Sequence, residues 1–524
     1  MKIKMMAGAV LAALGLFASC SKAGKDVQDP NQEGSTYVGI TLSMGTNDLR
    51  ANEDNNYNLE GTWNGKDEIK TIDVYVVDVA SGVVSTGAYN KNNFTITQTD
   101  GAASISIVPK TAIRTTPGQK KVYAVVNASP DVTLTLSQAT AAAFESAYNT
   151  VAHELAVTTV AMHTAGKDVI MASNAKECAL VVADGVTEAE AISGTRNRAK
   201  VDMKRVVARV LVTTNADTYE VKYSDGVTKM GTVKKISYAG AQGEKRFFIG
   251  QQLTADGKIK TPAYDYVPTG FADVWGDGKT HYDYSDLKAH TFTTNPRMAT
   301  KITSPTIDAK TIGEESLKHS LFMFEASHKY QTNSANTNVN NYDGNFRRGN
   351  TPYVLVRALF VPDAGAFADG EGGSYNEGQT FYLGANNRFY TTKENVTNPA
   401  KGGVVGQKFR TYVNGKVLYY AFVNPDRVPN TLDAPAFRNN IYRINIKGFK
   451  TIGTNWNPLY PEDPDNPAVP GTPENPDPRP NDDPTDNPNP FNPEDPNTPK
   501  ETWMSVEMSV LAWTVHTYDI ELSL

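Results

Sequence analysis

Apolar and polar residues alternate most regularly near the two ends of the chain. The N-terminal run lies in Thr36 to Met44, and its apolar positions are Val38, Ile40, Leu42 and Met44. The C-terminal run lies in Trp503 to Leu524, and its first apolar positions are Met504, Val506, Met508 and Val510. A period of two predicts a strand with one buried face. Because the two runs share length, period and bulk, one groove in a sheet could accept either of them.

The C-terminal run continues beyond this first alternation. An apolar step from Leu511 to Trp513 is followed by further alternating apolar positions, which are Tyr518, Ile520, Leu522 and Leu524. No glycine or proline interrupts this tail. It either folds back as the final strand of its own domain or pairs with another molecule.

Short apolar runs rich in β-branched residues and tyrosine predict strands in the interior of the chain. These runs are Ile69 to Val79, Val122 to Val126, Val201 to Thr213, Val233 to Ile249, Leu321 to Phe324, Tyr353 to Phe360, Lys416 to Val423 and Asn440 to Ile446. In the last run, Tyr442, Ile444 and Ile446 share one face, and Arg443 and Asn445 share the other. Long loops join the runs without regular strand–helix alternation, which predicts an all-β fold of antiparallel sandwiches.

Two stretches predict minor helices. The first runs from Ser137, a candidate N-cap, and carries apolar residues at helical spacing, namely Phe144, Tyr148, Val151 and Leu155. The second begins at Thr187, because Thr187 and Glu190 have the spacing of a capping box.

A length of 524 residues favours two domains with appendages, which we place at 51–250 and 251–457. A Pro- and Asp-rich tether follows at 458–502, and the tail occupies 503–524. Residues 458–499 hold 15 of the 29 prolines, and those from Pro458 to Pro476 recur every third residue. This is the period of a polyproline II helix, in which the tether could reach roughly 130 Å. Such a length suggests a reach between separate bodies.

The net charge is informative about the tether only, because the chain's net negative charge lies there. Residues 458–500 carry ten acidic residues against Arg479 and Lys500, a balance of −8, so the remainder of the −6 chain sums to about +2. Like charge along the tether disfavours its collapse. No basic stripe with interleaved aromatic residues is present, so a nucleic-acid partner is not expected.

The first 20 residues have the pattern of an export signal. Lys2 and Lys4 precede an apolar stretch that is too short to span a bilayer comfortably, and small residues lead to Cys20. This resembles a bacterial lipoprotein signal with Cys20 as the lipidated residue; the alternative is a plain secretory signal in which Cys20 is incidental. Residues 21–50 then comprise a flexible leash, the first strand and a polar loop. Arg50 and Ala51 in that loop form an exposed protease site by composition.

Motifs for catalysis or cofactor binding are missing from the sequence. The seven histidines have no metalloprotease or facial-triad spacing, and no nucleophile elbow, P-loop or dinucleotide fingerprint precedes a helix. Acidic loops at Asp273 to Asp277 and Asp363 to Glu371 could hold calcium, but neither keeps EF-hand spacing, and solvated turns are the simpler interpretation. We therefore expect no enzyme activity, no cofactor and no metal site.

Several stretches resemble the shaft subunits of short (minor, Mfa-type) fimbriae of Porphyromonas, in the fimbrillin or type V pilin family of Bacteroidales. They are Ala199 to Val212, Arg348 to Ala358, Gly415 to Pro425, Arg438 to Lys447, Asn455 to Leu459 and the tail from Met504. The resemblance runs from the signal segment to the C-terminus. It implies two tandem transthyretin-like β-sandwich domains.

The resemblance also implies an assembly route. The subunit is exported as an outer-membrane lipoprotein, an arginine-specific protease cuts after the first strand, and the groove left behind accepts the C-terminal strand of another subunit. By position, Arg50 and Ala51 flank the cut, and Thr36 to Met44 is the strand removed. The donor-strand residues are Met504, Val506, Met508, Val510, Trp513, Tyr518, Ile520 and Leu522.

The expected function is therefore a structural subunit of a cell-surface fimbrium that supports adhesion and biofilm formation. Its expected partners are further copies of itself, accessory anchor and tip proteins, the protease, and host or bacterial surface ligands. Two alternatives remain. One is a surface glycan-binding lipoprotein that presents aromatic side chains; the other is an anchor or tip subunit of the same fimbrium.

Overall fold

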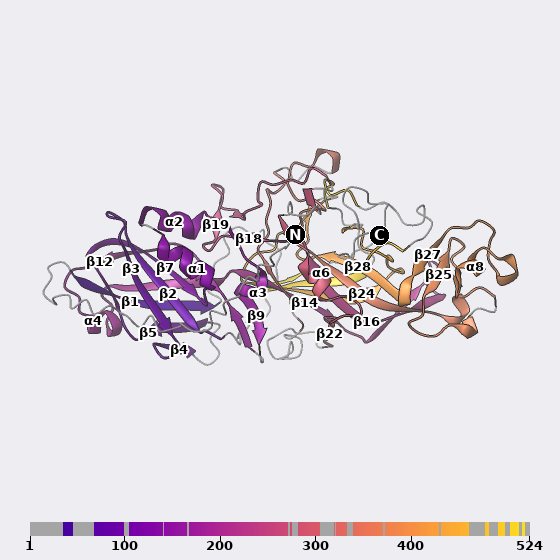
Figure 1. Cartoon of the computed structure of the whole chain (residues 1–524), viewed down its shortest axis with the longest axis horizontal. Helices are drawn as coiled ribbons and strands as arrows, with labels where there is room; N and C mark the ends of the chain where they lie inside the picture. Colours follow the sequence, from indigo (N-terminus) through magenta and orange to yellow (C-terminus); the bar gives the residue numbers. More distant parts are fainter. Residues whose placement is uncertain are drawn as a thin grey trace, which may run out of the picture.

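The computed structural model describes residues 35–45, 68–98, 104–139, 141–164, 167–270, 273–274, 281–303, 319, 321–332, 339–369, 372–428, 431–460, 477–480, 491–497, 504–512 and 516–518. Within these residues the fold is mainly β, as the sequence predicts. The molecule is elongated, with the first sheet in one half and two further large sheets in the other (Figure 1).

A ten-stranded sheet forms the first half. In spatial order its main strands are β3 (Val84–Asn90), β2 (Thr71–Asp78), β7 (Gly118–Val126), β11 (Ala172–Asn174), β13 (Arg198–Arg205), β1 (Thr36–Gly45), β5 (Ser104–Pro109) and β4 (Phe94–Gln98), with β12 (Cys178–Val182) beside β7 and β6 (Ile113–Thr115) beside β1. The sheet curls, because β6 returns to β3, where Ser85 Oγ donates a hydrogen bond to Thr115 Oγ1 at 3.1 Å. It thereby encloses an apolar core that includes Ile72, Val122 and Val201.

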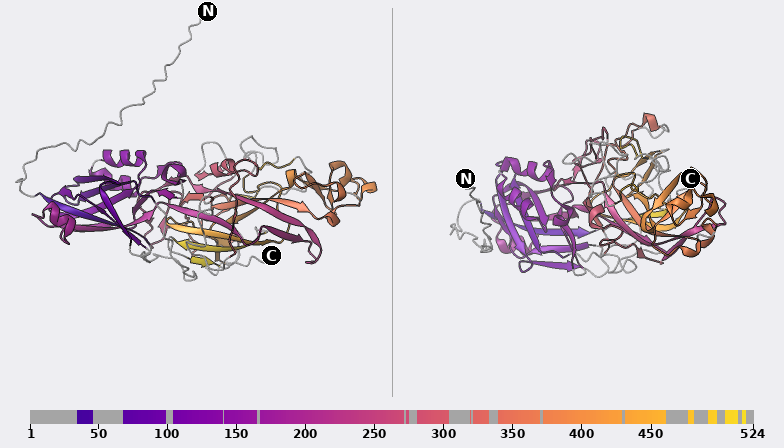
Figure 2. Two further views of the ribbon diagram at one scale, coloured as in Figure 1. Left: turned by 90° about the horizontal axis from the view of Figure 1, so that it is seen from below. Right: turned by 45° about the vertical axis from the view of Figure 1, so that its right-hand side comes forward.

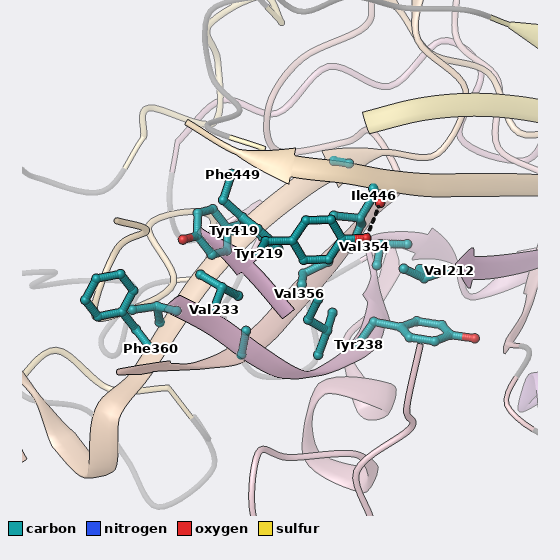
Figure 3. Packing of buried hydrophobic residues seen from close by; sticks show 14 of the residues in the cluster. Val212, Tyr219, Val233, Tyr238, Val354, Val356, Phe360, Tyr419, Ile446 and Phe449 are labelled. Atoms are coloured by element: carbon teal, nitrogen blue, oxygen red, sulfur yellow. Dashed lines mark hydrogen bonds between the residues drawn. The ribbon is translucent and has the colours of Figure 1, made fainter. Parts of the chain in front are cut away.

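The second half is a sandwich of two sheets. One contains β22 (Thr300–Lys301), β14 (Val207–Thr214), β31 (Asn440–Phe449), β32 (Met504–Ala512) and β33 (His516–Tyr518), with β23 (Leu321–Phe324) beside β14. The other contains β15 (Thr218–Lys222), β16 (Lys229–Ala241), β24 (Tyr353–Pro362) and β28 (Lys416–Phe422). Figure 3 shows their shared core, in which the Tyr219 hydroxyl donates to the Ile446 carbonyl oxygen at 2.8 Å.

Small sheets and short helices complete the described part of the chain. The small sheets pair β8 (His153–Glu154) with β18 (Arg246–Phe247), β9 (Ala161–Thr164) with β10 (Lys167–Ile170), β17 (Gly243–Glu244) with β21 (Tyr282–Asp283), β19 (Gln252–Leu253) with β20 (Ile259–Lys260), β29 (Asp426–Val428) with β30 (Thr431–Asp433), and β25 (Phe381–Gly384) with both β26 (Phe389–Tyr390) and β27 (Phe409–Tyr412). The α-helices are α1 (Pro130–Gln138), α2 (Ala141–Asn149), α3 (Val157–Val160), α4 (Glu188–Ser193), α6 (Ser285–Ala289) and α8 (Lys393–Val396).

The sheets are not purely antiparallel, which corrects the sequence-based expectation. Among the described strands, three pairs are parallel, namely β1 with β13, β14 with β22 and β14 with β31. The paired strands lie far apart in the sequence, so no tight hairpin constrains their direction.

The predicted strand Val201 to Thr213 is two strands that belong to different sheets. β13 ends at Arg205 in the first sheet, and β14 begins at Val207 in the second half. Val206, between them, is 0 % exposed and lies in a core to which both halves contribute. The change of sheet therefore comes at Val206, and the domain bounds 51–250 and 251–457 remain a prediction.

The helical prediction over Ser137 to Leu155 was partly wrong. Ser137 lies in α1, whose N-cap is Ser129, with Pro130 in the first turn. Phe144 and Tyr148 lie in α2 and are buried, as their spacing predicts. The helix ends at Asn149. A few residues later, His153 and Glu154 pair as a strand with Phe247 and Arg246, so the helix does not continue to Leu155.

The second helical prediction is confirmed. The hydroxyl of Thr187 accepts from the backbone N–H of Glu190, and the Glu190 carboxylate accepts from the backbone N–H of Thr187 at 2.8 Å. This capping box starts α4, which packs against β1.

Both faces of β31 are buried, although its sequence alternates. Tyr442, Ile444 and Ile446 face the sandwich core as predicted. On the other face, Arg443 and Asn445 are at most 6 % exposed. Thr213 joins them, because Arg443 Nε donates to its hydroxyl at 2.8 Å and that hydroxyl donates to Asn445 at 2.9 Å.

Candidate functional site

Strand β1 is embedded in the core of the first half. Its four predicted apolar positions are at most 4 % exposed, and they are Val38, Ile40, Leu42 and Met44. Their neighbours in that core include Ile107, Val201 and Met203. The alternation in the sequence therefore gives the buried face of β1 correctly.

β1 is paired along both of its edges. On one side, Gly39 to Met44 run parallel to Arg198 to Met203 of β13. On the other side, Leu42 to Gly45 pair with β5, and Thr36 to Val38 pair with β6. Loss of β1 would thus open two sheet edges and an apolar slot between them, which is the arrangement that accepts an added strand.

The start of β1 is held by polar contacts to the chain before and after α4. The Thr36 hydroxyl donates to the Ala183 carbonyl oxygen at 2.8 Å and accepts from the backbone N–H of Val186 at 3.1 Å. Asn197 Nδ2 also donates to this hydroxyl, at 3.0 Å. Sequence reasoning missed these contacts, since Thr36 and Asn197 are separated by 161 positions.

A close backbone approach fixes β1 against α4. A β-carbon on Gly39 would lie 1.9 Å from the carbonyl oxygen of Ala191, so only glycine fits there without a shift. Farther along, Arg198 Nε donates to the Thr41 hydroxyl at 2.9 Å and a guanidinium nitrogen donates to the Ile192 carbonyl oxygen. α4 and its flanking loops therefore secure the N-terminal half of β1.

The predicted donor strand forms two strands at the end of the second half. Met504, Val506, Met508 and Val510 lie in β32, and Tyr518 lies in β33. β32 runs antiparallel to β31, with Val506, Met508 and Val510 opposite Ile446, Ile444 and Tyr442. In Figure 2 the yellow C-terminal strands lie along the second half, away from the indigo strand β1. Within one chain, the tail thus takes the position of a final strand beside β31.

Six predicted site residues lie outside the described residues. They are Cys20, Arg50, Ala51, Trp513, Ile520 and Leu522. Their assignments as lipidation, processing and donor-strand residues remain predictions.

Three of the described histidines, His153, His163 and His328, have structural partners. His328 is fully buried between the carbonyl oxygens of Ala263 and Asn350, and burial lowers its pKa to about 4. His163 Nδ1 lies 2.8 Å from Asp168 Oδ1, and His153 Nε2 lies 3.1 Å from the Ala147 carbonyl oxygen. Among the described residues, no three acidic, histidine or cysteine side chains are grouped closely enough to hold a metal ion.

Acidic residues also serve local structure. Asp363, in one of the candidate calcium loops, accepts from the backbone N–H of Gly365 at 3.0 Å and caps a short 3-10 helix. Glu244 is 2 % exposed and accepts from the Thr261 hydroxyl and from the Ala263 N–H, and burial raises its pKa to about 8. Glu244 is therefore protonated near neutral pH and holds the segment 261–263 against β17.

A hollow lies at the far end of the second half. It has a volume of about 620 Å³, and its aromatic lining residues are Tyr223 and Trp456. Trp456 is 0 % exposed, and Arg479 lies over its ring at 4.0 Å from the centroid. An indole covered in this way does not offer the open stacking surface that the glycan-binding alternative requires.

None of the described helices is long and apolar enough to cross a membrane.

Comparisons with known proteins show what the chain is similar to. Residues 410–519 match the family model described as the C-terminal part of fimbrillin, the major fimbrial subunit protein type IV. Over 99 % of its length, the chain is 34 % identical to one minor fimbrium subunit Mfa1 of Porphyromonas gingivalis, and 33 % identical to a second, each of which is covered to 99 %. The tip fimbrial protein Mfa3 of the same organism gives a TM-score of 0.32 at 13 % identity, covering 79 % of this chain and 95 % of that one.

Proposed function

The chain belongs to the minor fimbrium subunit family typified by Mfa1, and we propose that it is a shaft subunit that polymerises by donor-strand exchange. In this proposal the protein is a structural subunit of a cell-surface fimbrium without catalytic activity. Its two halves act as tandem transthyretin-like domains, the first of which accepts a strand while the second supplies one.

The observation that carries the proposal is the position of β1. It is an interior strand with four buried apolar anchors, yet a single cut after it would separate it covalently from the rest of its sheet. Each anchor contributes roughly 1.5–3 kcal/mol when fully buried. A vacated slot would therefore bind strongly to another strand of matching period.

The tail has the matching period, and within its own chain its strand β32 pairs with β31. We infer that β32 pairs with β31 before assembly and leaves this edge when a neighbour offers the vacated slot. The tail is longer than β1, because its alternation resumes at Tyr518. A longer apolar strand gains more buried area in the slot and would replace β1 after cleavage.

The proposed route begins with export of a lipoprotein through Cys20, and cleavage between Arg50 and Ala51 by an arginine-specific protease releases β1. The finished fimbrium supports adhesion and biofilm formation, with accessory anchor and tip proteins at its ends. A tip subunit has no further groove to fill, whereas this chain carries a donor tail. The shaft role therefore fits better than the tip role.

A peptide-binding experiment tests the proposal. We would prepare the chain without residues 503–524, intact or cleaved after Arg50 with β1 washed away, and titrate both with a labelled 503–524 peptide. The proposal predicts binding at the β31 edge of both proteins and an additional, tighter site in the cleaved protein only, which a peptide carrying Val506→Asp and Val510→Asp should not occupy. Equal binding to intact and cleaved protein would place the tail on β31 alone and contradict strand exchange.

A further inference from the structure

The Pro- and Asp-rich segment is anchored to the second half through Asp477, which is 1 % exposed. Arg357 donates from Nε and Nη2 to Asp477 Oδ2 at 2.9 and 2.6 Å, and Lys416 Nζ donates to Oδ1 at 2.8 Å. Arg357 lies in β24 and Lys416 begins the neighbouring β28. Burial alone would raise the pKa of Asp477, but these two cations outweigh it and lower the pKa, so the carboxylate stays charged.

A second anchor lies at residues 491–497. The backbone N–H groups of Gly349, Arg348 and Leu432 donate to the carbonyl oxygens of Pro493, Asp495 and Asn497, at 3.1, 3.0 and 3.0 Å. Asn497 is 0 % exposed, and its Nδ2 donates to the Thr351 hydroxyl at 2.8 Å. A β-carbon on Gly349 would lie 2.5 Å from Pro493 Cβ, so glycine at this position permits the close approach.

The segment also covers an apolar surface. Side chains on the outer face of β24 and β28 form a core of their own, which includes Tyr353, Leu355, Leu418 and Tyr420. Phe491 packs against this core, with its ring centroid 5.9 Å from that of Tyr420. The contacts made by 477 and 491–497 are therefore those of a folded element and not of a freely extended leash.

The backbone of the segment returns to its own starting point. The Asn457 N–H donates to the Asp477 carbonyl oxygen at 3.4 Å, and the Phe491 N–H donates to the Pro458 carbonyl oxygen at 3.0 Å. The chain between Pro458 and Phe491 consequently adds almost nothing to the distance that the tail can span. Only residues 498–503 separate the anchored Asn497 from the start of β32 at Met504.

We propose that residues 477–480 and 491–497 form a docked strap, and that only residues 498–503 connect the anchored Asn497 to the tail that a second copy of this chain binds. This inference rests on the proposed function. Fully extended, that connection spans about 25 Å, far less than the roughly 130 Å of an extended tether. The acceptor slot of the second copy must lie within this distance. The second half of one subunit therefore touches the first half of the next directly.

Two matched deletions test the strap in the polymer. Removal of residues 465–468 shortens the chain between Pro458 and Asp477, and removal of residues 498–501 shortens the connection after Asn497. We expect the first deletion to leave polymer yield and axial repeat unchanged, and the second to lower the yield at least tenfold. Equal tolerance of both deletions, or a shorter repeat after the first, would overturn the proposal.

Hydrogen–deuterium exchange on the full-length monomer tests the strap independently of polymerisation. We expect slow exchange at the amides of Gly349, Leu432 and Phe491, and exchange at Phe491 at least tenfold faster in Asp477→Asn. Asp483→Asn, which removes the same charge from the same segment, should leave exchange unchanged. Fast exchange in the wild-type protein would overturn the strap even if Asp477→Asn fails to fold. Slow exchange in a chain that never polymerises would instead contradict the proposed function and leave the strap standing.

Discussion

Gly39 of β1 lies so close to Ala191 of α4 that a β-carbon on Gly39 would stand 1.9 Å from the Ala191 carbonyl oxygen. This close contact, the hydrogen bonds of Thr36 and the strand pairing on both edges hold β1 in one defined position in the sheet. These contacts would hold β1 in place until the cleavage that we propose.

The first prediction tests how closely Gly39 of β1 packs against α4. Gly39→Ala should lower the free energy of unfolding by about 1–3 kcal/mol, because the added methyl group meets backbone atoms that cannot move freely. Chemical denaturation of the purified full-length chain measures the change. Gly373→Ala is the matched control, since a β-carbon on Gly373 would meet no heavy atom within 4 Å. Equal stability of the two variants would contradict the tight approach.

The second prediction concerns maturation. Arg50→Ala should keep β1 attached and prevent polymerisation, because the apolar slot stays filled. N-terminal sequencing of surface polymer from the wild type should begin at Ala51. Arg196→Ala, at an exposed arginine in the first half, should polymerise normally. Polymer from the Arg50 variant, or wild-type polymer that still begins at Cys20, would show that cleavage does not control assembly.

The third prediction concerns the faces of the tail. Val506→Asp and Val510→Asp should each abolish SDS-resistant ladders, since an unpaired charge in an apolar groove costs several kcal/mol. Ser505→Asp is the matched control, because Ser505 alternates with these positions and carries the same new charge. If the Ser505 and Val506 variants assemble alike, the period-two alternation does not describe the bound strand.

The fourth prediction concerns pH. The Glu244 carboxyl in the folded protein stays protonated up to a pKa of about 8, whereas its ordinary pKa is 4.5. Between these values the unfolded chain loses the proton first, so the folded state loses about 1.4 kcal/mol of stability per pH unit as pH rises. Glu244→Gln, which keeps the acceptor oxygen without the charge, should remove this contribution. Denaturation midpoints of the two proteins between pH 5 and 8 measure the difference, and parallel pH profiles would contradict it.

Local patterns in the sequence predicted several elements well. The alternation from Val38 to Met44 gave the buried face of β1, the spacing of Thr187 and Glu190 gave the start of α4, and Asn440 to Ile446 gave β31. Each of these depends on residues a few positions apart. Ser129 followed by Pro130 is also a local start signal, and it marks the beginning of α1.

Other features required contacts between distant parts of the chain. The run Val201 to Thr213 reads as one strand, but its two parts join different sheets on either side of Val206. Proline period and acidic charge predicted an extended tether, whereas Asp477 is drawn into the fold by Arg357 and Lys416, which lie 120 and 61 positions away.

The sequence by itself determined which faces are apolar, where the ends of the chain resemble one another, and which family the protein resembles. Only the tertiary structure decided that β1 lies between β13 and β5, that β32 rests beside β31, and that the strap returns to Pro458. The physical reason is that periodicity fixes the orientation of a strand relative to a core but carries no information about its partner. Pairing depends on backbone edges and buried charges that meet only once the chain has folded.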